Sequence, residues 1–350
     1  MGVVDRCAYE TALQEVYGYI CSNFTRAEPR RRAWMYLYHL ANAPEDAPGR
    51  RRHLASYDRE QRADGAQRLL TSAQWDEQRI RAELLDLVIS RFGGVGGALY
   101  LTEVAFPKKG HQAAGVARQF SIESRRLENC QLALVLLHRS PNGAVALVDA
   151  ELYLPRVWVT DDDRRSKAGV PPGLGYRSKS RIGMAMIRRA LGAGLSPDVV
   201  LATLMCRDKP LLQSALRTVG LPHFLPLTAD ELARVRHVAE PGRMGLTEGF
   251  AAVGEAEHRR SGWSYHYVNG RGALTGPAFS ALAAQSQTMA RSWAALRDDV
   301  KLDRYEVRSW RGWHRHVTLA MVSQVAVEMS RRADVGPERA PSGLEGRWAV

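Results

Sequence analysis

The chain has 350 residues, of which 45% are hydrophobic and 25% charged, and these ordinary values exclude a disordered or fibrous protein. Its 49 lysines and arginines outnumber 37 aspartates and glutamates and give a net charge of +12, which favours nucleic acid or another polyanion as a partner. The alternative source of this excess is the arginine bias of a GC-rich genome, which the many alanines, arginines and glycines also favour.

Neither a membrane segment nor a disulfide framework is predicted. The four cysteines, Cys7, Cys21, Cys130 and Cys206, are widely spaced and form no CxxC pair, so a zinc site is not expected. The chain lacks a run of about eighteen apolar residues, and its first ten residues are mixed and polar, unlike a signal peptide. These features predict a cytoplasmic protein with no membrane partner.

Residues 1–93 are predicted to form a helical N-terminal domain, because apolar residues recur at helical spacing up to Phe92. The glycine cluster from Gly93 to Gly97 then ends this pattern and is expected to form a linker or a tight loop. A strand follows the cluster and no GK[ST] is present, so it is not a phosphate-binding loop.

Residues 94–333 are predicted to form a single α/β domain. Three apolar or β-branched strands with short connections suggest an antiparallel meander, at 98–101, 131–138 and 144–152. Next come a helix, a strand, a helix and a short strand, at 178–193, 199–205, 210–219 and 223–226. This order is typical of an RNase H-like mixed sheet with flanking helices.

The remaining segments have weaker patterns. Residues 228–275 are expected to hold a short helix and one or two hairpin strands around Trp263, Tyr265 and Tyr267. A long helix is predicted at 276–300, with an apolar stripe that indicates core packing, and a last helix at 313–329. Residues 334–350 contain two prolines and three glycines and are predicted to be a flexible tail.

Short motifs in a fixed order carry a family resemblance. They are Glu28–Ala33, Gln67–Asp76, Phe106–Gly110, Gly115–Gln119, Glu128–Gln131, Glu151–Pro155, Lys167–Pro171 and Leu302–Trp313. With these motifs the chain resembles a bacterial insertion-sequence transposase of the DDE type, in the subgroup of DDE superfamily endonucleases. The resemblance covers most of the chain, and it implies that residues 228–275 are a shortened β insertion.

All three acids that the resemblance implies are missing. The first aspartate of the family corresponds to Thr102 before the lysine pair, and the second corresponds to Thr203 at the end of its strand. The third acid, a glutamate on the long helix, corresponds to Ala290, and its flanking basic positions correspond to Ser286 and Arg297. Offsets of minus four and plus seven place these three positions on one helix face.

This loss predicts a pseudoenzyme. Two magnesium ions held by carboxylates clamp the attacking and leaving oxygens in this chemistry, and a threonine hydroxyl or an alanine methyl cannot replace a carboxylate. We therefore predict no metal and no cofactor. The predicted function is nucleic-acid binding without cutting, in an inert insertion-sequence remnant or in a domesticated transposase. A third option, a scaffold for other proteins, has no positive support, and a homodimer is left open.

Basic residues near the implied DNA face are the candidates for nucleic-acid binding. They are Lys108, Lys109, Arg118, Arg177, Lys179, Arg181, Arg297, Arg308, Arg311 and Arg315. Between Ser309 and His316, tryptophans interleave with arginines, a pattern that can stack bases and bind phosphates. The alternative there is that the tryptophans belong to the core, and we expect both: core tryptophans and exposed arginines.

In an alternative function, the former active-site cleft, which lacks its three acids, binds a small molecule. Glu103, Cys206, Asp208 and His316 could border it and perform acid–base or nucleophilic chemistry on a small molecule. The protein would then be an enzyme or accessory protein of natural-product biosynthesis, built on a transposase scaffold. A buried glutamate and an inert buried cysteine are the simpler interpretation. The run from Asp161 to Asp163 lacks EF-hand spacing and is expected to be a loop or a helix N-cap run.

Overall fold

The computed structural model describes residues 6–42, 64–203, 209–227, 251–254, 264–268 and 276–334. Four α-helices and a 3₁₀ turn come first: α1 (Arg6–Ile20), η1 (Cys21–Asn23), α2 (Ala27–Asn42), α3 (Asp64–Thr71) and α4 (Glu77–Phe92). Helix α4 begins where the Asp76 carboxylate accepts hydrogen bonds from the Gln78 and Arg79 amides, and it ends at Gly93, whose φ is +90°.

A mixed sheet follows. Strands β1 (Ala98–Pro107), β3 (Arg126–Arg139) and β4 (Val145–Leu152) pair antiparallel, and β2 (Ala117–Ser121) pairs with the first part of β3. On its other side, β1 pairs parallel with β5 (Val199–Ala202), and β5 pairs parallel with β6 (His223–Leu227). Strands β8 (Ser264–Val268) and β7 (Ala251–Gly254) extend the sheet in antiparallel fashion.

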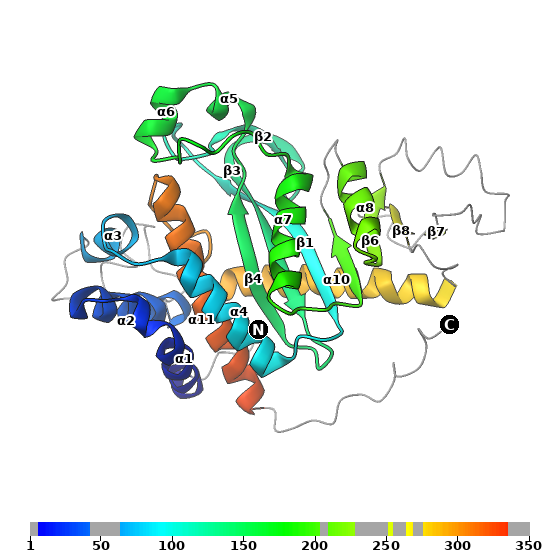
Figure 1. Ribbon diagram of the computed structural model, residues 1–350, viewed down its shortest axis with the longest axis horizontal. Helices are drawn as coiled ribbons and strands as arrows, with labels where there is room; N and C mark the ends of the chain where they lie inside the picture. The colour runs from blue at the N-terminus through cyan, green and yellow to red at the C-terminus, as the bar shows by residue number, and fades with distance from the viewer. Residues whose placement is uncertain are drawn as a thin grey trace.

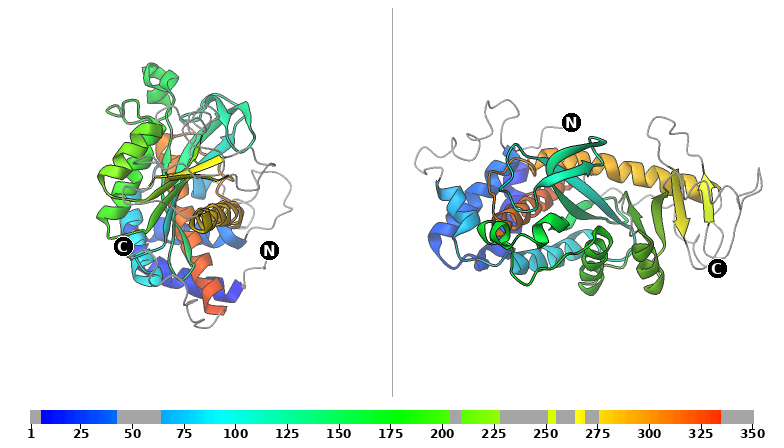
Figure 2. Two further views of the ribbon diagram at one scale, coloured as in Figure 1. Left: turned by 90° about the vertical axis from the view of Figure 1, so that its right-hand side faces the viewer. Right: turned by 90° about the horizontal axis from the view of Figure 1, so that it is seen from above.

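Helices cover both faces of this sheet. Helices α7 (Lys179–Gly192) and α8 (Lys209–Thr218) lie on one face, and α10 (Gly276–Asp299) lies on the other (Figure 2). Helix α7 approaches β1 closely because it has Gly183 at the contact, where a Cβ would stand 2.6 Å from the Leu101 side chain. The short helices α5 (Arg156–Val159) and α6 (Asp162–Lys167) lie at the end of the sheet near β2 (Figure 1).

The last helix, α11 (Trp310–Asp334), joins the N-terminal helices to the sheet (Figure 1). It packs along β4 and against α1, α2, α3 and α4. For example, the Tyr9 hydroxyl of α1 lies 2.9 Å from Ser323 Oγ of α11, and it donates to the Leu37 carbonyl of α2. Most of the buried apolar residues of the helices and of the sheet form one continuous core, and Ala105, Cys130 and Leu132 form a small second cluster.

The predicted fold class, an RNase H-like mixed sheet with flanking helices behind a helical N-terminus, is confirmed. The strand order β4–β3–β1–β5–β6 reproduces the expected meander and its helix–strand additions. Asp161 caps α6 as predicted, and hairpin strands β7 and β8 occur within residues 228–275.

Several predicted bounds were wrong. Strand β1 extends to Pro107 and not only to residue 101, and α11 spans Trp310–Asp334 where a helix at 313–329 was predicted. Strand β2 was not predicted, because its polar side chains alternate only weakly. The domain boundary at residue 93 stays a prediction, and residues 335–350 lie outside the described part of the chain. In the part that the structure describes, every helix is too short or too polar to cross a membrane.

Candidate functional site

Thr102 and Thr203 meet where the pairing between strands β1 and β5 finishes, in the middle of β1 and one residue beyond the end of β5. The two strands are parallel and pair up to Leu101 and Ala202, so the next residue of each chain lies at the same level of the sheet. The Thr203 amide donates to the Leu101 carbonyl at 3.1 Å, and the two threonine hydroxyls hydrogen-bond to each other at 2.6 Å. Thr102 is buried.

Ala290 and Arg297 lie on α10, on the face of the sheet opposite α7. Ala290 is exposed, whereas Ser286, one turn earlier, is buried. Arg297 Nη1 donates to both carboxylate oxygens of Glu123 at 2.8 Å, and its Nη2 donates to the Ala105 carbonyl at 3.3 Å. Arg297 therefore ties the end of α10 to the β2–β3 turn through the ion pair with Glu123, and to β1 through the hydrogen bond to Ala105.

These residues do not suit a magnesium site. Magnesium requires oxygen ligands in octahedral geometry, usually including carboxylates, but each threonine hydroxyl here already bonds the other and Ala290 has no donor atom. Across the residues that the structure describes, histidine, cysteine, aspartate and glutamate side chains nowhere gather in a group of three or more that could hold a metal ion.

Glu103 points to the other face of the sheet. Successive strand residues alternate in direction, and Glu103 forms a salt bridge with Lys179 of α7, the helix that also contacts Leu101. Burial raises the pKa of Glu103, and the Lys179 ammonium opposes this rise. Since Thr102 faces away from α7, Glu103 cannot take over a ligand position beside Thr102.

The other candidates for a reused cleft do not assemble with Glu103. Cys206 and Asp208 lie outside the described residues. His316 is fully buried on α11, with Nδ1 2.6 Å from the Tyr36 hydroxyl and Nε2 2.9 Å from the Leu302 carbonyl. Burial lowers the pKa of His316 to about 4. The prediction that His316 borders a cleft was therefore wrong, because α2 covers it.

The ten basic residues predicted to bind nucleic acid differ in their exposure and in their partners. Those with exposed side chains are Lys109, Arg118, Arg181, Arg308 and Arg311. Lys108 lies 3.8 Å above the Tyr305 ring and is half-buried. Three others form ion pairs within the protein: Arg177 with Glu151, Lys179 with Glu103 and Arg297 with Glu123.

The structure places Arg315 in the interior, which contradicts its predicted role as an exposed residue that binds nucleic acid. It is fully buried and donates hydrogen bonds to the Leu69 and Trp75 carbonyls, and it forms an ion pair with Glu77. Its guanidinium lies 4.7 Å above the Trp75 ring. Arg315 thus holds α3 and the start of α4 against α11, so the prediction of an exposed arginine there was wrong.

The exposed cations gather where β1 ends. The Asn129 side chain on β3 donates to the Lys108 and Gly110 carbonyls, which holds the lysine loop against the sheet. The Ala114 amide of the same loop donates to the Arg308 carbonyl at 2.8 Å. We call Lys108, Lys109, Arg118, Arg308 and Arg311 the basic rim; it joins the loop after β1, strand β2 and the start of α11.

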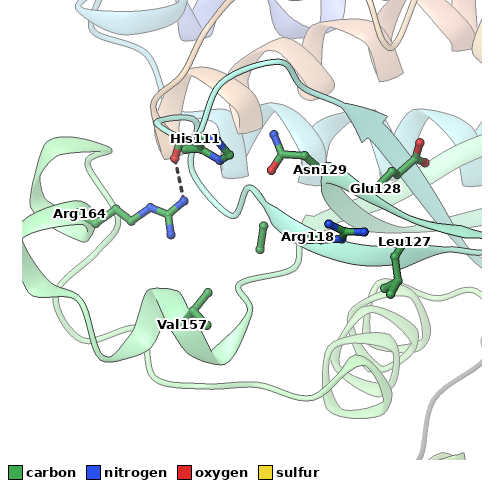
Figure 3. Close-up of a pocket in the computed structure, with 8 residues that line it drawn as sticks. His111, Arg118, Leu127, Glu128, Asn129, Val157 and Arg164 are labelled. Atoms are coloured by element: carbon green, nitrogen blue, oxygen red, sulfur yellow. Dashed lines mark hydrogen bonds between the residues drawn. The ribbon is translucent and has the colours of Figure 1, made fainter.

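A pocket that the sequence did not reveal adjoins the basic rim (Figure 3). It has a volume of about 810 Å³ and is lined by His111, Ala117, Arg118, Leu127, Glu128, Asn129, Val157 and Arg164. Only Arg118 was among the predicted site residues. His111 and Arg164 carry no motif of their own, and the loop and helix that bear them meet only in the folded chain.

One comparison with known proteins agrees with this fold. A sequence model described as DDE superfamily endonuclease matches residues 21–315. Among curated proteins, none matches the chain significantly.

Proposed function

Because this chain belongs to the DDE superfamily endonucleases, we propose that it binds nucleic acid and has lost the metal-dependent cutting reaction. Membership of this family implies contact with nucleic acid. The loss of cutting is our inference, and it rests mainly on one observation, the hydrogen bond of 2.6 Å between the Thr102 and Thr203 hydroxyls.

That hydrogen bond supports the loss of cutting on chemical grounds. Two neutral hydroxyls that satisfy each other neither attract nor neutralise a divalent cation, whereas the reaction needs two cations to stabilise the charge on its reacting oxygens. The nearby carboxylate of Glu103 forms an ion pair with Lys179 on the opposite face of the sheet. Ala290 on α10 contributes no oxygen.

The basic rim supports retained binding. Its basic side chains, exposed except for the half-buried Lys108, come from three elements that the fold brings to one end of β1, and such side chains supply most phosphate contacts. The net charge of +12 strengthens attraction to a polyanion. Helices α7 and α8, which contribute no residue to this rim, carry Arg188 and Arg217 near their C-terminal ends.

The alternative, small-molecule chemistry in a reused cleft, gains no support here. It requires a cavity beside Glu103 and Thr203, but the pocket in Figure 3 is lined by other residues. Glu103 is buried against α7 and His316 is buried under α2. We therefore do not propose a biosynthetic role.

The test is duplex-DNA binding across a salt series, with a cleavage assay on the same samples. We expect affinity to fall steeply with salt and no nicked product with Mg²⁺ or Mn²⁺. The double variant Lys109→Ala/Arg311→Ala should weaken binding and reduce the slope of log K against log salt by roughly 2, about one unit for each lost phosphate contact.

The matched control is Arg188→Ala/Arg217→Ala, which removes two exposed arginines from the far ends of α7 and α8. It should leave affinity and slope nearly unchanged. Absence of binding at low salt would overturn the binding proposal, and metal-dependent nicking by the wild-type protein would overturn the loss of cutting.

A further inference from the structure

We propose that the pocket beside the basic rim takes one unpaired nucleotide of a DNA strand, with Phe120 stacking against the next base. This inference rests on the proposed function, because it specifies the form of DNA that this end of the molecule prefers.

The walls come from five parts of the chain. His111 belongs to the loop after β1, Arg118 to β2, and Leu127 and Asn129 to β3. Val157 on α5 and Arg164 on α6 close the opposite side (Figure 3). A volume of about 810 Å³ lies within the range typical of small-ligand sites, and a mononucleotide is a ligand of that class.

Hydrogen bonds hold these walls in place. Arg164 Nη2 donates to the His111 carbonyl at 2.7 Å and to the Val116 carbonyl at 3.0 Å. Its guanidinium also lies 4.0 Å above the Trp158 ring, and the indole Nε1 donates to the Val116 carbonyl at 2.8 Å. The pocket is thus formed before a ligand enters, which lowers the entropic cost of binding.

One face of the β2–β3 hairpin carries both polar and apolar side chains. Arg118 is paired with Asn129 across the two strands, and Phe120 is paired with Leu127, so all four side chains share that face. Phe120 is 52% exposed and Leu127 is 58% exposed, and Val157 across the pocket is 56% exposed. These apolar side chains therefore remain available to a flat apolar surface.

A nucleotide matches this combination. The base contacts the aliphatic side chains of Leu127 and Val157, while the Arg118 guanidinium and the His111 imidazole are exposed toward its phosphate. Glu128 also lines the pocket, but its carboxylate accepts from Ser124 Oγ and pairs with Arg126. An aromatic ring next to basic side chains is a typical platform for single-stranded bases.

The nucleotide must be unpaired. A base inside a duplex is stacked and paired on its edges, so it cannot enter a side pocket without leaving the helix. The pocket adjoins Lys109 and Arg308 through the loop that Asn129 and Ala114 hold, so a duplex lying on the basic rim would extend its single-stranded end toward the hairpin. We therefore expect a preference for overhanging ends over blunt ends.

The experiment compares a blunt duplex with the same duplex carrying a short overhang, whose first unpaired base is the fluorescent analogue 2-aminopurine. Wild-type protein should bind the overhang duplex about 5- to 100-fold more tightly, the range expected for one stacked base, and should change the fluorescence. Phe120→Ala and Leu127→Thr should bring this ratio close to one without weakening blunt-duplex binding. Both residues are exposed, so the fold should be unaffected.

Two controls separate the possible failures. Leu211→Thr, which alters an exposed leucine on α8, should keep the ratio, and Lys109→Ala/Arg311→Ala should weaken both duplexes equally. If wild-type protein binds both duplexes with equal affinity, the pocket inference is wrong and the proposed function stands. If it binds neither duplex, the proposed function fails as well.

Discussion

At the scale of single residues, Thr102 within β1 and Thr203 just after β5 have the closest relation to the proposed loss of cutting. They directly follow the last paired residues of these two parallel strands and lie side by side, so two aspartates there would bring two carboxylates together. Two adjacent carboxylates repel each other unless a cation lies between them, whereas two hydroxyls form a stable hydrogen bond without one.

We predict that the triple variant Thr102→Asp/Thr203→Asp/Ala290→Glu gains Mn²⁺ binding. Added Mn²⁺ should raise its melting temperature by several degrees, because a ligand that binds only the native state stabilises that state. Differential scanning fluorimetry with and without Mn²⁺ measures this shift. Thr102→Asn/Thr203→Asn, which adds no charge, and the wild-type protein should not respond; a response from either would contradict the assignment.

His316 gives the protein a specific acid sensitivity. Its imidazole stays neutral in the fold because burial lowers its pKa to about 4, while in the unfolded chain it takes a proton below about pH 6.5. The unfolded state therefore binds more protons between these values, and stability falls as the pH falls through them. The full loss amounts to about 3 kcal/mol, from the difference between the two pKa values.

His316→Gln should therefore flatten the dependence of the unfolding free energy on pH between 6.5 and 4, as measured by urea denaturation at each pH. The informative quantity is the slope, since the substitution also changes the contacts with Tyr36 and Leu302. His111→Gln, at an exposed position, should keep the wild-type slope. An unchanged slope in His316→Gln would show that another group controls the acid response.

At the scale of elements, successive side chains of strand β1 point to opposite faces of the sheet and meet different neighbours there. Thr102 and Phe106 point to one face, where Phe106 packs edge-on against Tyr305 and Trp313. Leu101 and Glu103 point to α7 on the other face. A sequence in which Thr102 and Glu103 are neighbours therefore does not produce a combined site, because the strand directs them to opposite sides of the sheet.

The turn into β1 depends on Gly97. Its φ is +76°, and a Cβ on it would stand 2.1 Å from the Arg139 carbonyl oxygen of β3. Gly97→Ala should destabilise the protein by about 2 kcal/mol or more, because the backbone of β1 or β3 must shift. Gly110→Ala, at a loop glycine with no atom within 4 Å of an added Cβ, should change the stability by less than about 0.5 kcal/mol. Chemical denaturation of both variants measures the contrast.

At the scale of the whole molecule, a buried charge network connects the N-terminal helices to the sheet. Arg81 of α4 donates to the Ala150 carbonyl of β4 at 2.8 Å and to Thr318 Oγ1 of α11 at 2.7 Å, and it pairs with Asp149. Glu151 belongs to the same network; burial alone would raise its pKa, but the His314 imidazole, whose Nε2 lies 3.9 Å from Glu151 Oε2, and nearby arginines lower it to about 2.

We predict that Arg81→Ala costs roughly 3–5 kcal/mol, since Asp149 would lose a buried partner. Arg79→Ala on the same helix removes only an exposed pair with Glu83 and should cost under about 1 kcal/mol. Because the hydrophobic core is continuous, the wild-type protein should unfold in one transition seen equally by tryptophan fluorescence and circular dichroism. Two separate transitions would instead support independent folding of residues 1–93.

Much of the architecture could be predicted because its causes are local. Strand alternation, the Asp161 cap and the glycine break after Phe92 depend on adjacent residues, so they can be recognised in the sequence. That Thr102 and Thr203 correspond to two aspartates of the family stays a prediction from motif order, and in the sheet the two residues lie together. The basic excess predicted a polyanionic partner but not the surface that would contact it.

The sequence by itself determined the fold class and the absence of acids at the three positions that the family resemblance marks. Only the tertiary structure decided that Arg315 and His316 are buried, that Lys179 serves Glu103, and that a pocket forms between the β2–β3 hairpin and helices α5 and α6. The physical reason is distance along the chain. The exposure and the pKa of a side chain depend on which remote element covers it, and for His316 that element is α2, whose Tyr36 lies 280 residues earlier.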